Sequence, residues 1–128
     1  MAYILDTDVG IHLRDRDVAI TLKTGELEGP VLLSVVSRVE LEGGVYRDPA
    51  MSALRRTRLD LMLSTLPVLA FDEAAADAYR GIVEVAGYSR RKLLDRMIAA
   101  QALAHRATLV TCHGDDFRDV PGLKLLEW

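Results

Sequence analysis

Short apolar runs separated by longer helical patterns limit the folds that are open to this chain. Five runs rich in aliphatic and β-branched residues have the composition of strands: 3–7, 31–36, 67–71, 108–112 and 123–127. Strands of this kind that alternate with helices predict a parallel sheet buried on both faces. We therefore expect an α/β fold of three layers, α/β/α, around a central, mostly parallel sheet of four to five strands.

The segments between these runs have helical patterns with typical helix-end residues. Ser37 and Asp72 are predicted to cap the third and fifth helices, because such side chains accept hydrogen bonds from free backbone N–H groups. Gly29, Pro30 and Pro49 mark breaks between helices and the following segments. The expected helices span residues 8–14, 16–26, 38–46, 50–65, 73–86 and 92–106.

The size and composition predict one globular domain, residues 1–128. Apolar residues make up 50% of the chain and charged residues 27%, a balance that can fill a core. No apolar run reaches the roughly 18–20 residues that a membrane span requires, and the N-terminus lacks the basic segment of a signal peptide. The one cysteine, Cys112, has no partner for a disulfide within the chain. We therefore expect a cytoplasmic protein with no membrane contact.

Carboxylates follow three of the expected strands, and another acid opens the last long helix. They are Asp6 and Asp8 after the first run, Glu40 after the second, Asp115 and Asp116 after the fourth, and Asp95 in helix 92–106. Ligands of parallel sheets bind outside the carboxyl ends of the strands, where these acids are expected to meet. Carboxylates that share a pocket raise one another's pKa, and a divalent cation relieves their repulsion. Oxygen ligands of this kind suit Mg²⁺ or Mn²⁺.

Each acid also has a structural interpretation. Asp6 can cap the helix that follows it, and Asp95 can stabilise the positive N-terminal end of its helix. Glu42 is predicted to be a solvated helix residue, and one of Asp115 and Asp116 is expected to serve only the turn. The wide apolar stripe around Asp95 predicts a largely buried helix, which favours a partner for its charge.

The order of these motifs resembles that of the PIN-domain ribonucleases, and among them the VapC-type toxins of bacterial toxin–antitoxin pairs. The resemblance rests on YILDTDV near the start, LSVVSRVELEGGV at 33–45, LLDRMIAAQALAHRATLVTCHGDDF at 93–117 and VPGLKLLEW at the end. These four segments cover both ends and most of the middle of the chain. The resemblance implies a PIN-like α/β/α fold.

The resemblance also implies a Mg²⁺- or Mn²⁺-dependent endoribonuclease in which the catalytic residues hold the metal ion. The E-L-x-x-G pattern selects Glu40, the D-x-x-I-A-A pattern selects Asp95, and the D-F pair selects Asp116 over Asp115. The implied catalytic and metal-binding quartet is Asp6, Glu40, Asp95 and Asp116. The implied partners are a cognate VapB-like antitoxin, an RNA substrate and a second copy of the chain in a homodimer.

Two departures from the family pattern lie next to these acids. The family often has Asn at the positions of Asp8 and His113. Asp8 can add a carboxylate to the metal cluster, and His113 can tune the site, bind metal or contact RNA. The residues expected to lie around the quartet and to orient its side chains are Thr7, Asp8, Thr111, His113 and Asp115.

Two arginine-rich segments are candidates for contacts with RNA. The net charge of −3 argues against a uniformly basic surface, so phosphate contacts have to come from local clusters. Arg90, Arg91 and Lys92 precede Asp95 and are predicted to hold RNA phosphates, with a solvated loop as the alternative. Residues 55–58, RRTR, are predicted to form a plain exposed face, with RNA or acidic antitoxin residues as alternative partners.

Two other functions fit part of the sequence. A receiver-like signalling module is also a small α/β protein with acids near its first strand, and Asp72 follows a middle strand as a phosphate acceptor does. The wholly helical pattern from 38 to 66 argues against it. The other alternative is a catalytically inert PIN-type scaffold that binds RNA without cleaving it, and the intact quartet argues against that.

Overall fold

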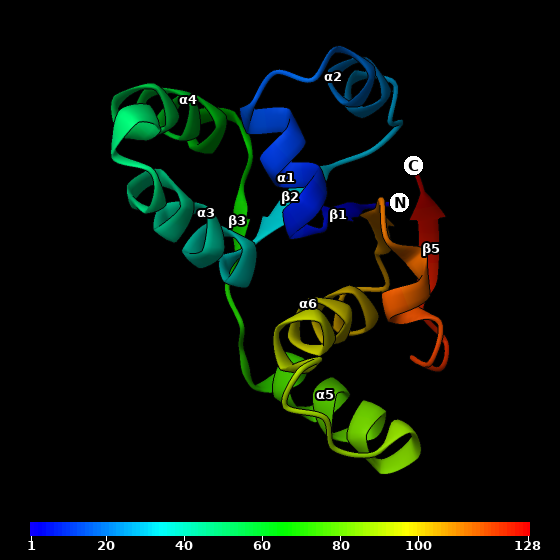
Figure 1. Cartoon of the computed structure of the whole chain (residues 1–128). Helices are drawn as coiled ribbons and strands as arrows, with labels where there is room; N and C mark the ends of the chain where they lie inside the picture. The colour runs from blue at the N-terminus through cyan, green and yellow to red at the C-terminus, as the bar shows by residue number, and fades with distance from the viewer.

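The computed structural model of the chain, residues 1–128, is built around a five-stranded sheet (Figure 1). Every pair of neighbouring strands is parallel, and the strands lie in the order β3-β2-β1-β4-β5. The strands are β1 (Tyr3–Leu5), β2 (Val31–Ser34), β3 (Val68–Leu69), β4 (Thr108–Thr111) and β5 (Lys124–Glu127). Each lies within one of the five runs expected from the sequence, so the prediction of a parallel sheet is confirmed.

Helices cover both faces of the sheet, which confirms the three layers (Figure 1). α5 (Glu73–Ala86) and α6 (Leu93–Ala104) pack on one face, and the first four helices lie over the other. These four are α1 (Thr7–Arg14), α2 (Val18–Gly25), α3 (Val35–Arg47) and α4 (Ser52–Thr65). Two 3₁₀ turns, η1 (Pro49–Met51) and η2 (Gly114–Phe117), complete the elements. None of the helices is both long enough and apolar enough to cross a membrane.

Alternation of side chains along the strands divides the core in two. On β1, Ile4 belongs to the cluster beneath α5 and α6, whereas Leu5 belongs to the cluster beneath α1 to α4. Both side chains are fully buried. A strand that is covered on both faces has to be apolar on both sides, so the run before Asp6 shows no alternation of polar and apolar residues.

The junction between β2 and α3 differs from the expectation. Ser34 caps α3 and accepts a hydrogen bond from the Val36 N–H at 3.0 Å, so the predicted cap at Ser37 is wrong. The buried hydroxyl of Ser34 also donates to the side chain of Gln101 on α6. The buried hydroxyl thus has both of the partners that burial requires, and Val35 and Val36 begin α3 although the apolar run assigned them to a strand.

The order of the strands reverses between β1 and β4. β2 and β3 follow on one side of β1, and β4 and β5 lie on the other. Ligands of open parallel sheets bind at such a switch point, outside the carboxyl ends of the strands. The receiver-like alternative requires the order 2-1-3-4-5, which this sheet does not have. Asp72, its expected phosphate acceptor, caps α5 as the helix pattern predicted and accepts from the Ala75 N–H at 3.0 Å.

Candidate active site at the carboxyl edge of the sheet

Asp6 is the buried acid at the switch point. It follows β1 directly, and only 5% of its surface is exposed. Its Oδ1 accepts a hydrogen bond from the Thr7 N–H at 2.9 Å, and its Oδ2 accepts from the Thr111 hydroxyl at 2.8 Å. Burial, and after it the charge of Asp8, raise the pKa of Asp6 to about 7 against the effect of these bonds. Asp6 therefore caps α1, as its structural interpretation predicted, and still carries a charge that is unfavourable where it lies.

Glu40 reaches the same edge from α3. Its Oε1 accepts a hydrogen bond from the Thr7 hydroxyl at 2.7 Å. Since an ionised carboxylate only accepts, Thr7 donates to Glu40 and has to accept from the Ser37 hydroxyl, 2.8 Å away. The buried Ser37 thus orients Thr7, and Thr7 orients Glu40. Sequence reasoning missed this role of Ser37. The available signal was its position on the same helix, three residues before Glu40.

Asp95 faces this edge from the first turn of α6, where the sequence placed it. Burial raises the pKa of Asp95, and the charges of Asp116, Glu40 and Asp8 raise it further, in that order. Asp116, Glu40 and Asp8 are thus the acids whose charges act on Asp95, and the charge of Arg91 acts on it in the opposite sense.

The two acids after β4 differ in their partners. Asp115 contacts the guanidinium of Arg118, three positions further along the chain. Asp116, in the same 3₁₀ turn, contacts neither a lysine nor an arginine. Asp116, the acid without a positively charged partner, is thus the one that the D-F pattern selects. The spacing of Asp115 and Arg118 was a signal for their pairing that sequence reasoning did not use.

The two departures from the family pattern contact each other. Nδ1 of His113 lies against Oδ2 of Asp8. Asp8 is also held by the backbone, since it accepts from the Val9 N–H at 2.7 Å and from the Cys112 N–H at 3.2 Å. The hydrogen bond with Asp8, and then its charge, raise the pKa of His113. The pairing fixes the imidazole at the rim of the site and leaves Nε2 as the ring nitrogen not engaged by Asp8.

The donor set at this edge fits a hard divalent cation. No member of the predicted quartet forms an ion pair with a lysine or arginine, although nine such pairs involve other acids of the chain. The side chains alone do not enclose an ion, because no three Asp, Glu, His or Cys residues come close enough together to do so. Mg²⁺ retains several waters and is often held by only one or two carboxylates. Carboxylates that hold such an ion partly through its waters are therefore compatible with this edge of the sheet.

Comparison with known proteins identifies the family. The model of the PIN domain matches residues 3–123. The chain belongs to the PIN-domain family. It is 27% identical over 134 residues to Ribonuclease VapC2 of Rickettsia felis, a match that covers 100% of this chain and 98% of that protein.

Solved structures show the same PIN-domain fold. A crystal structure of VapBC2 from Rickettsia felis, bound to a DNA fragment from its promoter, has a chain that matches with a TM-score of 0.86 and 26% identity. The match covers 100% of this chain and 99% of that one. A chain of FitAcB from Neisseria gonorrhoeae matches with a TM-score of 0.82 and 26% identity, over 98% of this chain and 96% of that one.

The basic loop before α6 of this PIN domain is partly occupied by internal contacts. Lys92 donates to Asp119 at 2.9 Å, and the buried Arg96 donates to the same carboxylate at 3.0 Å. Arg90 and Arg91 are exposed and form no ion pair. The RNA contacts assigned to the three residues stay predictions, and the two arginines are the ones whose charge is still unmatched.

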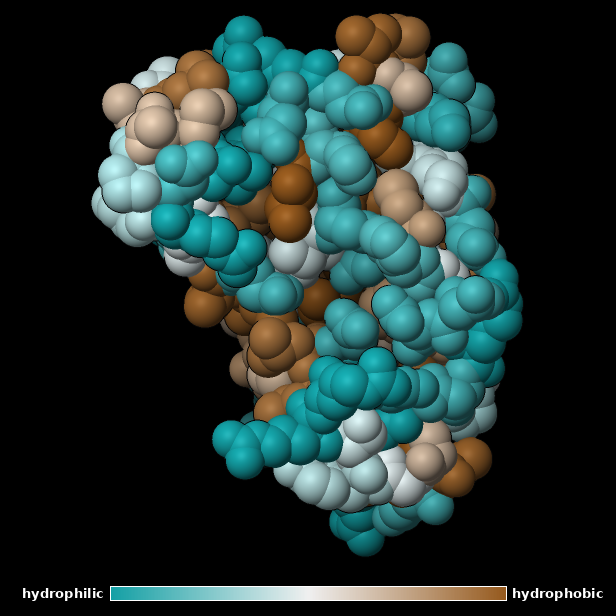
Figure 2. All heavy atoms as spheres, viewed as in Figure 1, coloured by the Kyte–Doolittle hydropathy of each residue, from teal (hydrophilic) through white to brown (hydrophobic).

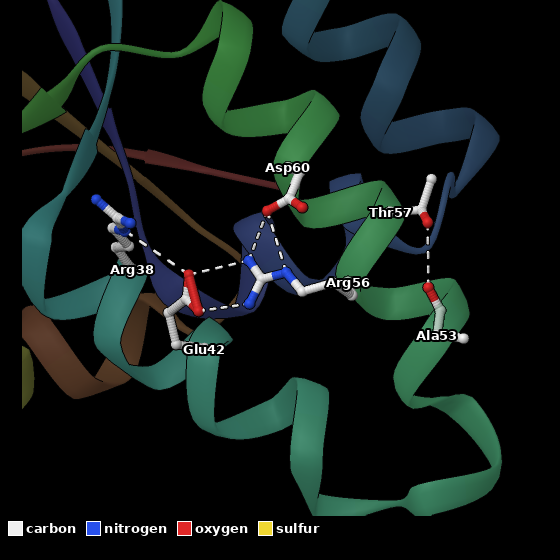
Figure 3. Close-up of polar contacts among 6 residues, drawn as sticks. All are labelled: Arg38, Glu42, Ala53, Arg56, Thr57 and Asp60. Carbon is white, nitrogen blue, oxygen red and sulfur yellow. Dashed lines mark hydrogen bonds and ion pairs between the residues drawn. The ribbon is translucent and has the colours of Figure 1, made fainter.

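The RRTR segment of the PIN domain is engaged on α4 (Figure 3). Arg56 contacts Glu42 of α3 and Asp60 of α4, each at 2.7 Å. Arg38 approaches the same Glu42 at 3.8 Å. The predictions of a solvated Glu42 and of a plain exposed face are wrong in this respect, because the two helices are joined by ion pairs.

Proposed function

We propose that this PIN domain is a metal-dependent endoribonuclease toxin that a cognate VapB-like antitoxin neutralises. The observation that carries the proposal is the set of acids at the switch point of the sheet that no lysine or arginine matches: Asp6, Glu40, Asp95 and Asp116. Similarity over the whole chain to Ribonuclease VapC2 supports RNA as the substrate. Likeness to a chain of VapBC2 supports an antitoxin as the partner.

The four acids are the proposed ligands of a Mg²⁺ or Mn²⁺ ion. When bound, such an ion supplies a polarised phosphoryl oxygen and a water of lowered pKa. Asp6, with a pKa of about 7, is partly protonated at neutral pH and has to release its proton to act as a ligand. Glu40 accepts from Thr7 through Oε1, so its Oε2 is free to accept a proton from the attacking water.

Arg90 and Arg91 are the proposed contacts to RNA phosphates, with a smaller part for Lys92 because Asp119 already neutralises it. The support for this assignment is their exposure and their place just before α6, the helix that carries Asp95. The proposed place of action is the cytoplasm, where the RNA of a bacterial cell is found.

A homodimer is proposed over an apolar groove between α3 and α6. The groove has a volume of about 280 Å³ and is lined by Val39, Leu94, Phe71 and other apolar residues beside Glu40. Val39 is 66% exposed and Leu94 45% exposed, which is unusual for large apolar side chains that sit together. Light scattering of wild type and of Val39→Glu tests this, with a dimer expected only for wild type.

Cleavage by the purified chain, free of antitoxin, tests the proposed reaction. We expect total cellular RNA to be cut in Mg²⁺ or Mn²⁺ and to stay intact in EDTA. The matched control is Asp95→Asn, which should leave the RNA intact in all three conditions. Cutting that persists in chelator would contradict the metal-dependent mechanism. RNA that the wild type binds but never cuts would favour the inert scaffold.

A further inference from the structure

A polar cavity lies beside the acids, between α1, α3 and α4. Its volume is about 260 Å³, and Thr7 and Glu40 form the wall that it shares with the candidate active site. Three arginines, Arg14, Arg47 and Arg55, line the rest together with Asp15 and Gly44. Figure 2 shows that the surface around α1 is largely hydrophilic. The site thus has a basic pocket directly next to its acids.

Arg14 brings a buried guanidinium into this pocket. The residue is only 5% exposed, and its Nε and Nη2 donate to Asp15 at 3.0 and 3.3 Å. Its remaining nitrogen, Nη1, lies beside Gly44, where an added Cβ would stand 3.2 Å from it. A side chain at position 44 would therefore press on Nη1 of Arg14, the nitrogen that does not bond to Asp15.

Arg55 enters the pocket from α4 without a carboxylate. Its Nη1 donates to the Gly44 carbonyl at 2.9 Å, while its Nε is buried and has no partner. Neither Arg55 nor the exposed Arg47 takes part in an ion pair. A buried donor without a partner is unfavourable, and more so when it is charged.

The next residue of α4 shows that acids are available to arginines on these helices. Arg56 is matched by Glu42 and by Asp60 (Figure 3). In the pocket, the carboxylate of Asp15 is already paired with Arg14, and even with Glu40 counted the three arginines exceed the two carboxylates by one charge. The pocket therefore keeps unmatched positive charge and unmatched donors, which an anion would satisfy.

We propose that this pocket binds a backbone phosphate of the RNA, next to the one that is cleaved. The inference rests on the nuclease function proposed above. Guanidinium groups bind phosphate oxygens through paired N–H donors, and phosphate contacts fix the position of a nucleic acid on a protein. Because the pocket shares a wall with Glu40, a phosphate held there sets the register of the chain that crosses the acids. An acidic side chain of the antitoxin is the competing occupant.

The test is RNA binding by Arg55→Gln, measured by fluorescence anisotropy in the non-cleaving Asp116→Asn background. We expect the Kd to rise about tenfold and the salt dependence of log K to lose about 0.7 in slope, the value for one contact to single-stranded RNA. Arg80→Gln on the far helix α5, an exposed arginine paired only with Glu84, is the matched control and should bind like the parent. In the cleaving background, Arg55→Gln should raise KM and leave kcat nearly unchanged.

A second variant keeps the test valid if Arg55→Gln folds poorly. Gly44→Ala leaves every arginine in place but adds a methyl group close to Nη1 of Arg14, and it should weaken RNA binding in the same way. Unchanged RNA affinity and salt slope in both variants would overturn the proposal. So would variants that bind RNA normally but no longer bind the antitoxin. Loss of binding on Arg55→Gln in a protein that never cleaves RNA would refute the nuclease function and still support the pocket.

Discussion

The carboxyl edge of the sheet and the outer surface of α3 and α4 are both rich in charge, but they match it differently. On α3 and α4, Glu42 is paired with Arg56, and this contact lowers the pKa of Glu42 (Figure 3). At the sheet edge, the buried Asp6 and the half-buried Asp95 lie among other acids and form no ion pair with a lysine or arginine, and their pKa values are raised. The carboxylates of the two regions thus have pKa shifts of opposite direction, and the raised pKa values are at the candidate active site.

The largest difference between the two regions should appear in catalysis. Replacing a residue that hydrogen-bonds to a metal ligand lowers activity about 10–100-fold. Loss of a ligand itself should therefore lower kcat/KM by at least about 100-fold. We expect this for Asp6→Asn, Glu40→Gln, Asp95→Asn and Asp116→Asn, measured as initial rates of cleavage of one RNA.

Two controls sharpen this prediction. Glu42→Gln changes an acid on the same helix as Glu40, and Asp115→Asn changes the neighbour of Asp116 that contacts Arg118. Both variants should retain activity within a few-fold of wild type. An essential Asp115 together with a dispensable Asp116 would show that the assignment of this pair is reversed.

The next effect concerns stability and pH in the metal-free protein. Asp in an unfolded chain titrates near 3.9, whereas burial and Asp8 raise the pKa of Asp6 to about 7. Between these values the folded chain holds a proton that the unfolded chain has lost, so the free energy of unfolding falls as pH rises. We expect Tm in EDTA to fall from about pH 4 to 7, and Asp6→Asn to remove most of the fall.

His113 contributes with the same sign at the upper end of this range. Its pKa is raised by the hydrogen bond with Asp8, so its stabilising effect is present below about pH 6.5 and is lost as pH rises through the folded pKa. His113→Gln should therefore alter only the upper part of the curve. A slope for Asp6→Asn equal to that of wild type between pH 4 and 6 would rule out the buried-acid explanation.

A smaller effect is expected from Asp95 alone. If it is one of several repelling acids, Asp95→Asn should raise the metal-free unfolding free energy by about 1 kcal/mol, a Tm increase of a few degrees. If it only stabilises the helix N-terminus, the change should lower that free energy by about 0.3–1 kcal/mol. Thermal melting in EDTA and in excess Mn²⁺ distinguishes the two, because only a ligand gives wild type the larger Mn²⁺ shift.

The smallest effect on stability is expected at the surface of α3 and α4, where the charges are paired. Arg56→Gln removes the contacts with Glu42 and Asp60 and should lower the unfolding free energy by at most about 1 kcal/mol, less in high salt. Arg80→Gln breaks a more exposed pair with Glu84 and should leave Tm unchanged. Urea unfolding at low and high salt measures both. A loss of cleavage in Arg56→Gln would mean that the ion pairs on α3 and α4 also influence the candidate active site.

Local patterns were enough to predict most of the elements. All five strands lie within the predicted runs, and Asp72 caps α5 through a residue three positions away. The cap of α3 was predicted three residues too late, since Ser34 accepts from the Val36 N–H, and Ser34 also contacts Gln101, 67 residues further along. Local propensity does not encode a partner at that separation.

The sequence by itself determined where the acids stand. Asp6, Glu40 and Asp116 each follow an apolar run, and the carboxyl ends of parallel strands share one edge, so their approach follows from the alternation of strands and helices. The resemblance to the family pattern, through the D-F pair, then selected Asp116 over Asp115 without knowledge of the contact with Arg118.

Only the tertiary structure decided which charges are matched. Lys92 meets Asp119 across 27 residues, and His113 meets Asp8 across 105. It also left Arg55 without an ion pair, because the nearby Asp15 pairs with Arg14, while the adjacent Arg56 is paired twice. The reason is physical: a charge is stabilised by what lies within a few ångströms of it, and in this chain those neighbours come from distant parts of the sequence.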